Sequence, residues 1–137
     1  MCRTLLVLIV TIEYQNIIRS NSQGVKTLSN SAQQTQLPQV ALDQIVDLYN
    51  QGHLEQTVSL AESLARQYPN ASILYEILGA AYLGLKKADK TIESYQKVLK
   101  HNPNNTDAYN HIGIALYDQG RFDEAVESYQ KAVSLEP

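Results

Sequence analysis

The sequence predicts an all-α protein built from three antiparallel helix pairs. From Pro38 onward, apolar residues recur at three- and four-residue spacings, and no segment shows the strict alternation of a β-strand. The passage from Ile73 to Pro103 is also repeated: from Tyr109, 34 residues after Tyr75, the same residue types return at the same spacings. A chain that repeats a unit of this length stacks similar helix pairs against one another.

Glycines and prolines divide this region into six expected helices. Gly52 and Gly120 lie at turns inside two of the pairs, where glycine can adopt the left-handed conformation that ends a helix. Pro69 and Pro103 lie just past helix ends, because proline cannot continue a helix. Asparagines follow each proline, in PNAS and PNNTD, and such side chains can cap the next helix. The expected helices span about residues 39–51, 54–67, 71–84, 88–101, 105–118 and 122–135.

The packing residues of the second and third pairs recur in register. Gly79 and Gly113 hold equivalent inner positions, where the missing side chain lets the partner helix approach closely. One pair cannot bury its own apolar face, so about three pairs must stack to be stable. The aligned residues are Tyr75, Leu78, Gly79, Tyr82, Tyr95 and Pro103 in the second pair, and Tyr109, Ile112, Gly113, Leu116, Ala125, Tyr129, Ala132 and Pro137 in the third.

This pattern resembles the tetratricopeptide repeat, whose signature is W-x2-L-G-x2-Y, then A-x3-F, then P, with a period of about 34 residues. The resemblance is strong over residues 72–137, where tyrosine replaces the tryptophan. Residues 38–71 keep Gly52, Pro69 and the length of a repeat, and are expected to form a degenerate first copy. The resemblance implies a right-handed α-solenoid with repeats at 38–71, 72–105 and 106–137.

Two segments of different character precede the repeats. Residues 1–19 contain a basic residue, Arg3, followed by the apolar run from Leu5 to Val10. This pattern fits a secretory signal or an anchor, a stray helix or strand, or a start codon assigned upstream of the real domain. Residues 20–37 are rich in Ser, Asn and Gln and predict a polar linker. We expect a cytoplasmic protein without membrane contact; a signal or anchor in residues 1–19 would instead make it secreted or membrane-anchored. Cys2 is the only cysteine, which excludes an internal disulfide.

Charge and motif content argue against several functional classes. Residues 38–137 hold 8 basic and 13 acidic residues, a net charge of −5, so we expect no nucleic-acid binding and a preference for neutral or basic partners. None of the three histidines has a second ligand at i+3 or i+4, so we expect no metal, no cofactor and no catalysis. His53 and His101 are expected to be exposed, and His111 to line a groove. The lysines at positions 86, 87, 90, 97 and 100 are expected to form a solvated outer helix face.

The function implied by the resemblance is that of a non-catalytic scaffold that binds a protein or peptide in a concave groove lined by the first helix of each pair. The apolar centre and carboxylate rim of the expected groove suit a peptide or helix with apolar anchors and some basic character. The family's carboxylate-clamp binders use Lys, Arg and Asn on these helices, and here only Asn110 fits that role. The expected groove residues are Leu42, Val46, Tyr49, Asn50, Glu76, Ala80, Leu83, Asp107, Asn110, Ile114, Tyr117 and Asp118.

Two further hypotheses follow from the same residues. The alternative to a scaffold is that the array forms the N-terminal accessory part of a larger enzyme of the glycosyltransferase or sulfotransferase type. The third repeat would also leave Tyr129, Ala132 and Val133 without a following helix to cover them. Because exposed apolar area is unfavourable in water, self-association through this end is expected as well.

Overall fold

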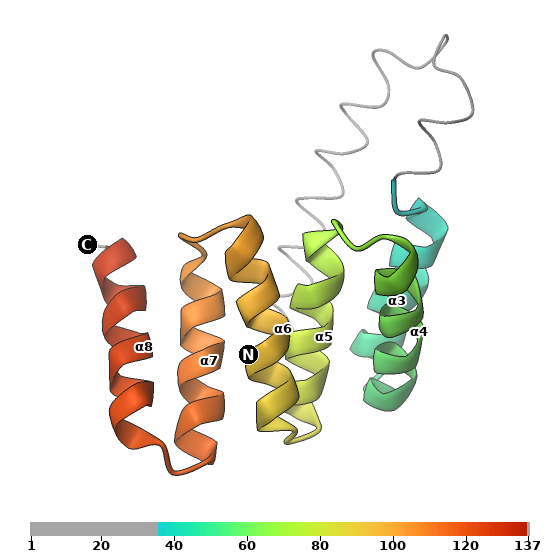
Figure 1. Cartoon of the computed structure of the whole chain (residues 1–137). Helices are drawn as coiled ribbons and strands as arrows, with labels where there is room; N and C mark the ends of the chain where they lie inside the picture. Colours follow the sequence, from blue (N-terminus) through green and yellow to red (C-terminus); the bar gives the residue numbers. More distant parts are fainter. Residues whose placement is uncertain (1–35, 137) are drawn as a thin grey trace, which may run out of the picture.

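The computed structural model describes residues 36–136, which form six α-helices. Figure 1 shows these helices one beside the next. No strand occurs among these described residues. Each helix boundary lies within one residue of the expectation, so the predicted all-α solenoid of antiparallel helix pairs is confirmed. The expectations for residues 1–19 and for the linker as far as residue 35 lie outside the described range. The helices are α3 (Gln39–Asn50), α4 (Leu54–Gln67), α5 (Ser72–Gly84), α6 (Ala88–His101), α7 (Thr106–Asp118) and α8 (Phe122–Leu135).

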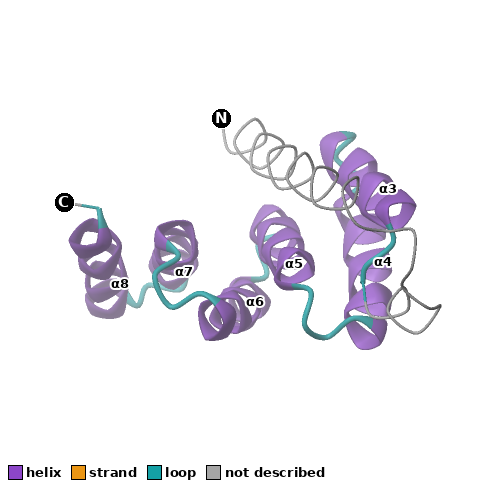
Figure 2. Ribbon diagram, turned by 90° about the horizontal axis from the view of Figure 1, so that it is seen from above, coloured by secondary structure: helices purple, strands orange, loops and turns teal. Residues whose placement is uncertain are grey.

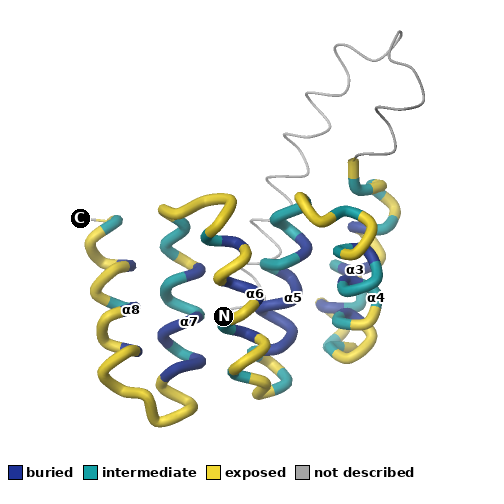
Figure 3. Tube along the Cα trace, viewed as in Figure 1, coloured by how far each residue is buried: buried dark blue, intermediate teal, exposed yellow. Residues whose placement is uncertain are grey.

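The helices form two layers, as the view from above in Figure 2 shows: α3, α5 and α7 make one layer, and α4, α6 and α8 make the other. The helix α5 contacts α4, α6 and α7, which places it at the centre of the array. Figure 3 shows the result: α5 is buried along much of its length, whereas α8 is exposed on most of its surface. Fully buried Ile45, Leu74 and Ile77 lie in a core that α3, α4 and α5 share, so the first repeat packs directly on the second.

The turn inside each helix pair is closed by the same backbone hydrogen bond. In the first turn the amide of His53 donates to the carbonyl of Leu48 at 2.9 Å, and the equivalent bonds of the other two turns measure 2.9 and 3.0 Å. This motif requires a left-handed residue, and Gly52 and Gly120 supply it with φ values of 81° and 75°. In the second turn the equivalent residue is Lys86, whose backbone adopts the same left-handed conformation with φ 59° although it is not a glycine.

Two inner-face glycines allow each of the last two pairs to close. A β-carbon on Gly79 would lie 2.6 Å from the ring of Tyr95, and one on Gly113 would lie 2.7 Å from the ring of Tyr129. Both distances are shorter than carbon atoms tolerate, so each tyrosine ring occupies the space that the glycine leaves. The expectation that these glycines permit close helix approach is confirmed.

The expected asparagine caps are confirmed at one helix and wrong at the other. The side chain of Asn105 accepts a hydrogen bond of 2.9 Å from the amide of Ala108 and caps α7. The residue that precedes α5 is Ala71, and no side chain caps that helix. Asn70 therefore lies one position too early in the chain to act as the cap.

The outward side of α3, which we call the leading face, is polar where the later first helices are apolar. Asp43 and Asp47 are exposed there, whereas the residues of α5 at the equivalent positions pack into the core. Polar side chains of this kind let the first repeat of an array face water. The leading face comprises Val40, Asp43, Gln44 and Asp47, and the equivalents on α5 are Leu74, Ile77, Leu78 and Ala81, all of them buried.

Candidate protein-interaction surfaces

The expected groove residues lie on α3, α5 and α7, in the same layer of the molecule. Apart from Asp107, they occupy equivalent positions of the three repeats, so differences in their exposure reflect their surroundings. The structure exposes Asn50, Asp107, Tyr117 and Asp118, leaves Val46, Glu76, Leu83, Asn110 and Ile114 half-buried, and buries Leu42, Tyr49 and Ala80.

The three buried residues correct the expected site. Leu42 is 6% exposed and belongs to the core shared with α4 and α5, while Tyr49 and Ala80 are 7% and 8% exposed and pack in one cluster. Such side chains hold the repeats together and offer little surface to a partner. They were expected in the groove because periodicity identifies the helix on which a residue lies, but it does not identify which neighbours cover that residue.

Exposure at one of these repeat positions increases along the array. Tyr49 is buried, Leu83 is half-buried, and Tyr117 is 59% exposed. The reason is that Tyr49 packs beside Ala80 and Ala81 of the next first helix, whereas no helix among the described residues covers Tyr117 in this way. The expected groove is therefore most accessible along α7.

Four exposed apolar side chains lie at the α7–α8 end of the array, and we call this surface the terminal face. Tyr117 and Phe122 make an edge-to-face aromatic pair with 5.2 Å between ring centroids. Val126 and Val133 extend this surface along α8, although their equivalents on α6 pack against the core that α6 and α7 share. The terminal face comprises Tyr117, Phe122, Val126 and Val133, which are 59%, 56%, 51% and 70% exposed.

The three histidines lie in different surroundings. His111 packs on Tyr95 rather than lining a groove: its ring is parallel to that of Tyr95, with 4.8 Å between centroids and 5° between planes. His53 and His101 are exposed, as expected. Within residues 36–136, no group of three or more His, Cys, Asp or Glu side chains is placed to hold a metal ion. Among the same residues, no helix is both long enough and apolar enough to cross a bilayer.

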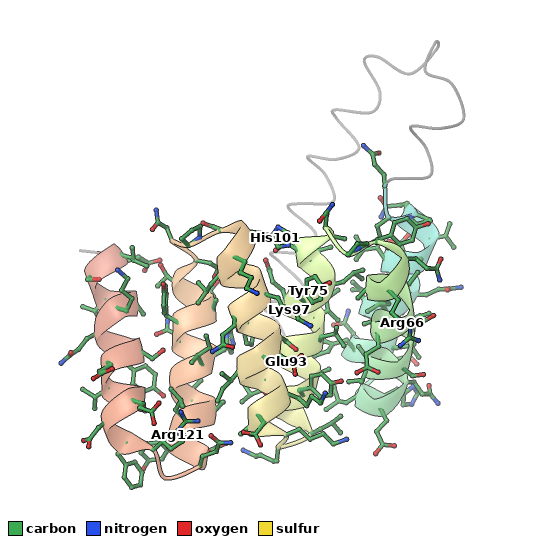
Figure 4. All side chains as sticks on the ribbon, viewed as in Figure 1. Arg66, Tyr75, Glu93, Lys97, His101 and Arg121 are labelled. Carbon is green, nitrogen blue, oxygen red and sulfur yellow. The ribbon has the colours of Figure 1, made fainter. Side chains whose placement is uncertain are left out.

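A hollow of about 260 Å³ lies in the opposite layer, between α4 and α6, and we call it the α4–α6 hollow. Figure 4 shows Arg66 of α4 on one side of it and Lys97 and Glu93 of α6 on the other, with Tyr75 of α5 between them. The ammonium of Lys97 lies 5.3 Å from the centroid of the Tyr75 ring. The lysines were expected on a solvated helix face, and for Lys97 the structure adds an aromatic contact from a different helix.

Both carboxylates in the α4–α6 hollow are already engaged. Glu93 lies 3.3 Å from the ammonium of Lys97 and 3.8 Å from that of Lys90. Glu62 accepts a hydrogen bond from the hydroxyl of Tyr82. Burial raises the pKa of this hydroxyl above its usual value, and the hydrogen bond to Glu62 acts in the same direction. The hydroxyl therefore keeps its proton and stays a donor to Glu62.

An exposed ion pair lies at the turn between α7 and α8. At the start of α8 the guanidinium of Arg121 lies 2.5 Å from a carboxylate oxygen of Glu124. This contact lowers the pKa of Glu124 and raises that of Arg121. Because both side chains are solvent-exposed, the pair orders the turn beside Phe122 without contributing much to stability.

Family profiles match the last two repeats. The tetratricopeptide-repeat profile matches residues 106–137, and a second profile described as a TPR repeat matches residues 79–120. No curated protein matches the chain at a significant level. The two profiles together span residues 79–137, which hold most of the positions that recur in register.

Solved structures of the protein MamA have the same fold. MamA from AMB-1 is 31% identical with a TM-score of 0.66, over 72% of this chain and 54% of that chain. MamA from MSR-1 is 31% identical with a TM-score of 0.65, over 72% of this chain and 56% of that chain. MamA from Desulfovibrio magneticus RS-1, 24% identical with a TM-score of 0.66 over 69% of this chain and 54% of that chain, shows similarity of fold alone.

The chain thus spans about half the length of the MamA structures that it matches. The profile matches, the recurring turn hydrogen bonds and the glycine–tyrosine contacts all follow the same repeat. This chain belongs to the tetratricopeptide-repeat family.

Proposed function

We propose that the chain is a non-catalytic interaction scaffold that binds a partner helix or peptide along the exposed side of α7. Its repeats and its likeness to MamA support an interaction role in general. The observation that carries the proposal is the aromatic pair of Tyr117 and Phe122, because each ring is more than half exposed beside the apolar side chain of Ile114. Exposed aromatic residues that adjoin other apolar surface are typical of contact sites.

The repeats themselves indicate what kind of helix would fit. Tyr49 is the equivalent of Tyr117, and Ala80 and Ala81 of α5 cover it. Small residues of this kind let two helices approach closely, so the partner helix should carry alanine or glycine where it meets Tyr117. Asp107 and Asp118 lie exposed on the same helix, so basic residues beside those small residues would add electrostatic complementarity.

A peptide copied from α5 tests this proposal. A soluble synthetic version of residues 72–84 with added terminal lysines should bind the full chain, because this segment covers the equivalent surface of the first repeat. Changing both Tyr117 and Phe122 to Ala should weaken binding by about 1–3 kcal/mol, measured by calorimetry. The control is Val40→Ala, since Val40 is 68% exposed on the leading face. Equal affinity for the double variant and the control would contradict the proposal.

We also propose that a second copy of the chain is one partner, through the α8 part of the terminal face. Val126 and Val133 are equivalent to Ile92 and Leu99, which are half-buried against the core shared by α6 and α7. If the leading face of a second copy covered Val126 and Val133, it would place Asp43, Gln44 and Asp47 against them. Docking of this kind would bury carboxylates, which is unfavourable. Pairing of two terminal faces about a two-fold axis is therefore favoured over a chain of copies.

Sedimentation of the full chain over a range of concentrations tests self-association. Val126→Ser with Val133→Ser should abolish a dimer without unfolding the protein, since both side chains are exposed. Val40→Ser should leave the dimer intact. A dimer that survives the double change, or a wild-type chain that stays monomeric at the highest concentration, would exclude this second partner while leaving the peptide experiment informative.

A further inference from the structure

We propose that the α4–α6 hollow is a second docking site, in the layer opposite the α7 surface, and that it binds an acidic peptide segment through Arg66 and Lys97. The hollow has three walls: α4 and α6 form its sides, and α5 forms its floor with Tyr75, Leu78 and Tyr82. The half-buried ring of Tyr75 provides apolar contact for a peptide side chain, while Leu78 and Tyr82, each 5% exposed, close the floor beneath it. The charged groups on the two sides then determine which peptide is preferred.

The charges of the hollow do not balance. Arg66, Lys90 and Lys97 line it together with two carboxylates, Glu62 and Glu93. Glu93 pairs with both lysines, and Glu62 accepts the hydrogen bond from Tyr82. Arg66 makes no ion pair with any carboxylate among the described residues. These three cations and two carboxylates carry a net charge of +1, because the hydrogen bond from the neutral hydroxyl of Tyr82 leaves Glu62 charged. Arg66 is the cation that no carboxylate of the hollow pairs.

The unpaired guanidinium suits a carboxylate of a partner. Guanidinium groups bind carboxylates through two parallel hydrogen bonds, which gives this contact both strength and orientation. The ammonium of Lys97 is held between Glu93 and the Tyr75 ring and remains 45% exposed, so it can share an incoming carboxylate with Arg66. In a peptide with Glu or Asp next to an apolar residue, the carboxylate would then lie between Arg66 and Lys97. The apolar side chain would lie over the floor of the hollow.

The hollow thus prefers an acidic partner, whereas the charge of the rest of the molecule favours a basic one. The chain carries a net charge of −3, and the α7 surface presents Asp107 and Asp118. Two partners of opposite charge could therefore occupy the two layers at once, one basic on α7 and one acidic in the α4–α6 hollow. Because the second contact depends on exposed charges, salt should weaken it strongly.

Two tagged peptides with the full-length chain test this inference: Glu-Leu-Glu-Leu-Glu, and the same peptide with Gln in place of each Glu. Fluorescence anisotropy at low salt should show the acidic peptide binding about tenfold more tightly than the neutral one. Arg66→Gln and Lys97→Gln should each weaken binding of the acidic peptide by roughly five- to tenfold, and Lys97→Arg should restore most of it. The melting temperature of each variant verifies that the fold is retained.

The matched control is Lys131→Gln, which removes the same charge from an exposed position on α8. It should change the affinity by less than about twofold, because Lys131 is not among the residues that line the hollow. Tyr117→Ala should also leave the acidic peptide bound, which separates this site from the α7 surface. Equal binding of the two peptides, or equal losses for Arg66→Gln and Lys131→Gln, would overturn the proposal.

Discussion

The ring of Tyr95 lies flat on the imidazole of His111, with 4.8 Å between their centroids, and so joins the second repeat to the third. The imidazole is fixed in turn by a contact of 2.7 Å between its Nδ1 and the backbone carbonyl of Asp107. Tyr95 is only 3% exposed: His111 covers one face of its ring, and the missing side chain of Gly79 leaves room for the ring atoms Cδ2, Cε2 and Cζ.

Replacing His111 tests how much this stack stabilises the array. His111→Ala should lower the free energy of unfolding by about 1–2 kcal/mol, because it removes an aromatic contact and leaves Tyr95 partly uncovered. His111→Phe should retain most of the stability, since a phenyl ring can stack in the same place. Urea denaturation of the three proteins measures the difference, and equal losses for Ala and Phe would show that stacking is not what stabilises this interface.

The two inner glycines should respond differently to the same substitution. Gly79→Ala places a β-carbon against Tyr95, whose ring cannot move because His111 stacks on it, and should cost about 1–3 kcal/mol. Gly113→Ala meets Tyr129, which is only half-buried and has no such stack among the described residues, so it should cost less. Thermal denaturation of both variants checks the order of the two losses. A larger loss at Gly113 would contradict the role given to the stack.

Lys86 should be replaceable by glycine with a gain in stability. Its φ of 59° is costly for a residue with a side chain, and Gly52 and Gly120 occupy the equivalent turns at no such cost. The exposed ion pair of Lys86 with Asp118, at 3.4 Å, contributes little. Lys86→Gly should therefore raise the free energy of unfolding by about 0.5–1 kcal/mol, and Gly120→Lys should lower it by a similar amount. Chemical denaturation measures both changes. A lower free energy of unfolding for Lys86→Gly and a higher one for Gly120→Lys would show that the left-handed backbone at Lys86 is not costly.

Alkaline pH should destabilise the fold through Tyr82. Burial and the hydrogen bond to Glu62 raise the pKa of Tyr82 in the folded state above its ordinary value of 10.0. A raised folded-state pKa gives stability that is fully present below pH 10.0 and is lost as the pH rises from there through the folded pKa. Tyr82→Phe should reduce this loss in denaturation experiments above that pH, and Tyr68→Phe, a tyrosine not bonded to Glu62, should not. The same pH dependence in both variants would contradict this account.

The sequence identified the helices more reliably than the binding surface, and the reason is physical. A 34-residue period with glycines and prolines at its turns determines helix ends locally, which is why every boundary agreed within one residue. Accessibility depends on the neighbouring repeat: Tyr49 and Tyr117 hold the same repeat position, yet one is 7% exposed and the other 59%. Equivalence in sequence therefore could not tell a core tyrosine from a surface one.

The α4–α6 hollow could not be recognised from the sequence at all. Arg66, Tyr75 and Lys97 come from three helices, and no local spacing connects them. Each has an ordinary role on its own helix: the sequence assigned Lys97 to a solvated face and Tyr75 to the core. Only the packing of α4 and α6 over α5 brings the two cations and the ring around one space.

The contrast between the polar leading face and the apolar terminal face has a consequence for building longer arrays. A repeat unit inserted before α3 would have to cover Asp43 and Asp47, and an extension in that direction would fail unless both were replaced by apolar residues. A unit joined after α8 would find Tyr117, Val126 and Val133 ready to be covered, as their equivalents in the earlier repeats are. Gene duplication or protein design can therefore lengthen this solenoid in only one direction without altering existing residues.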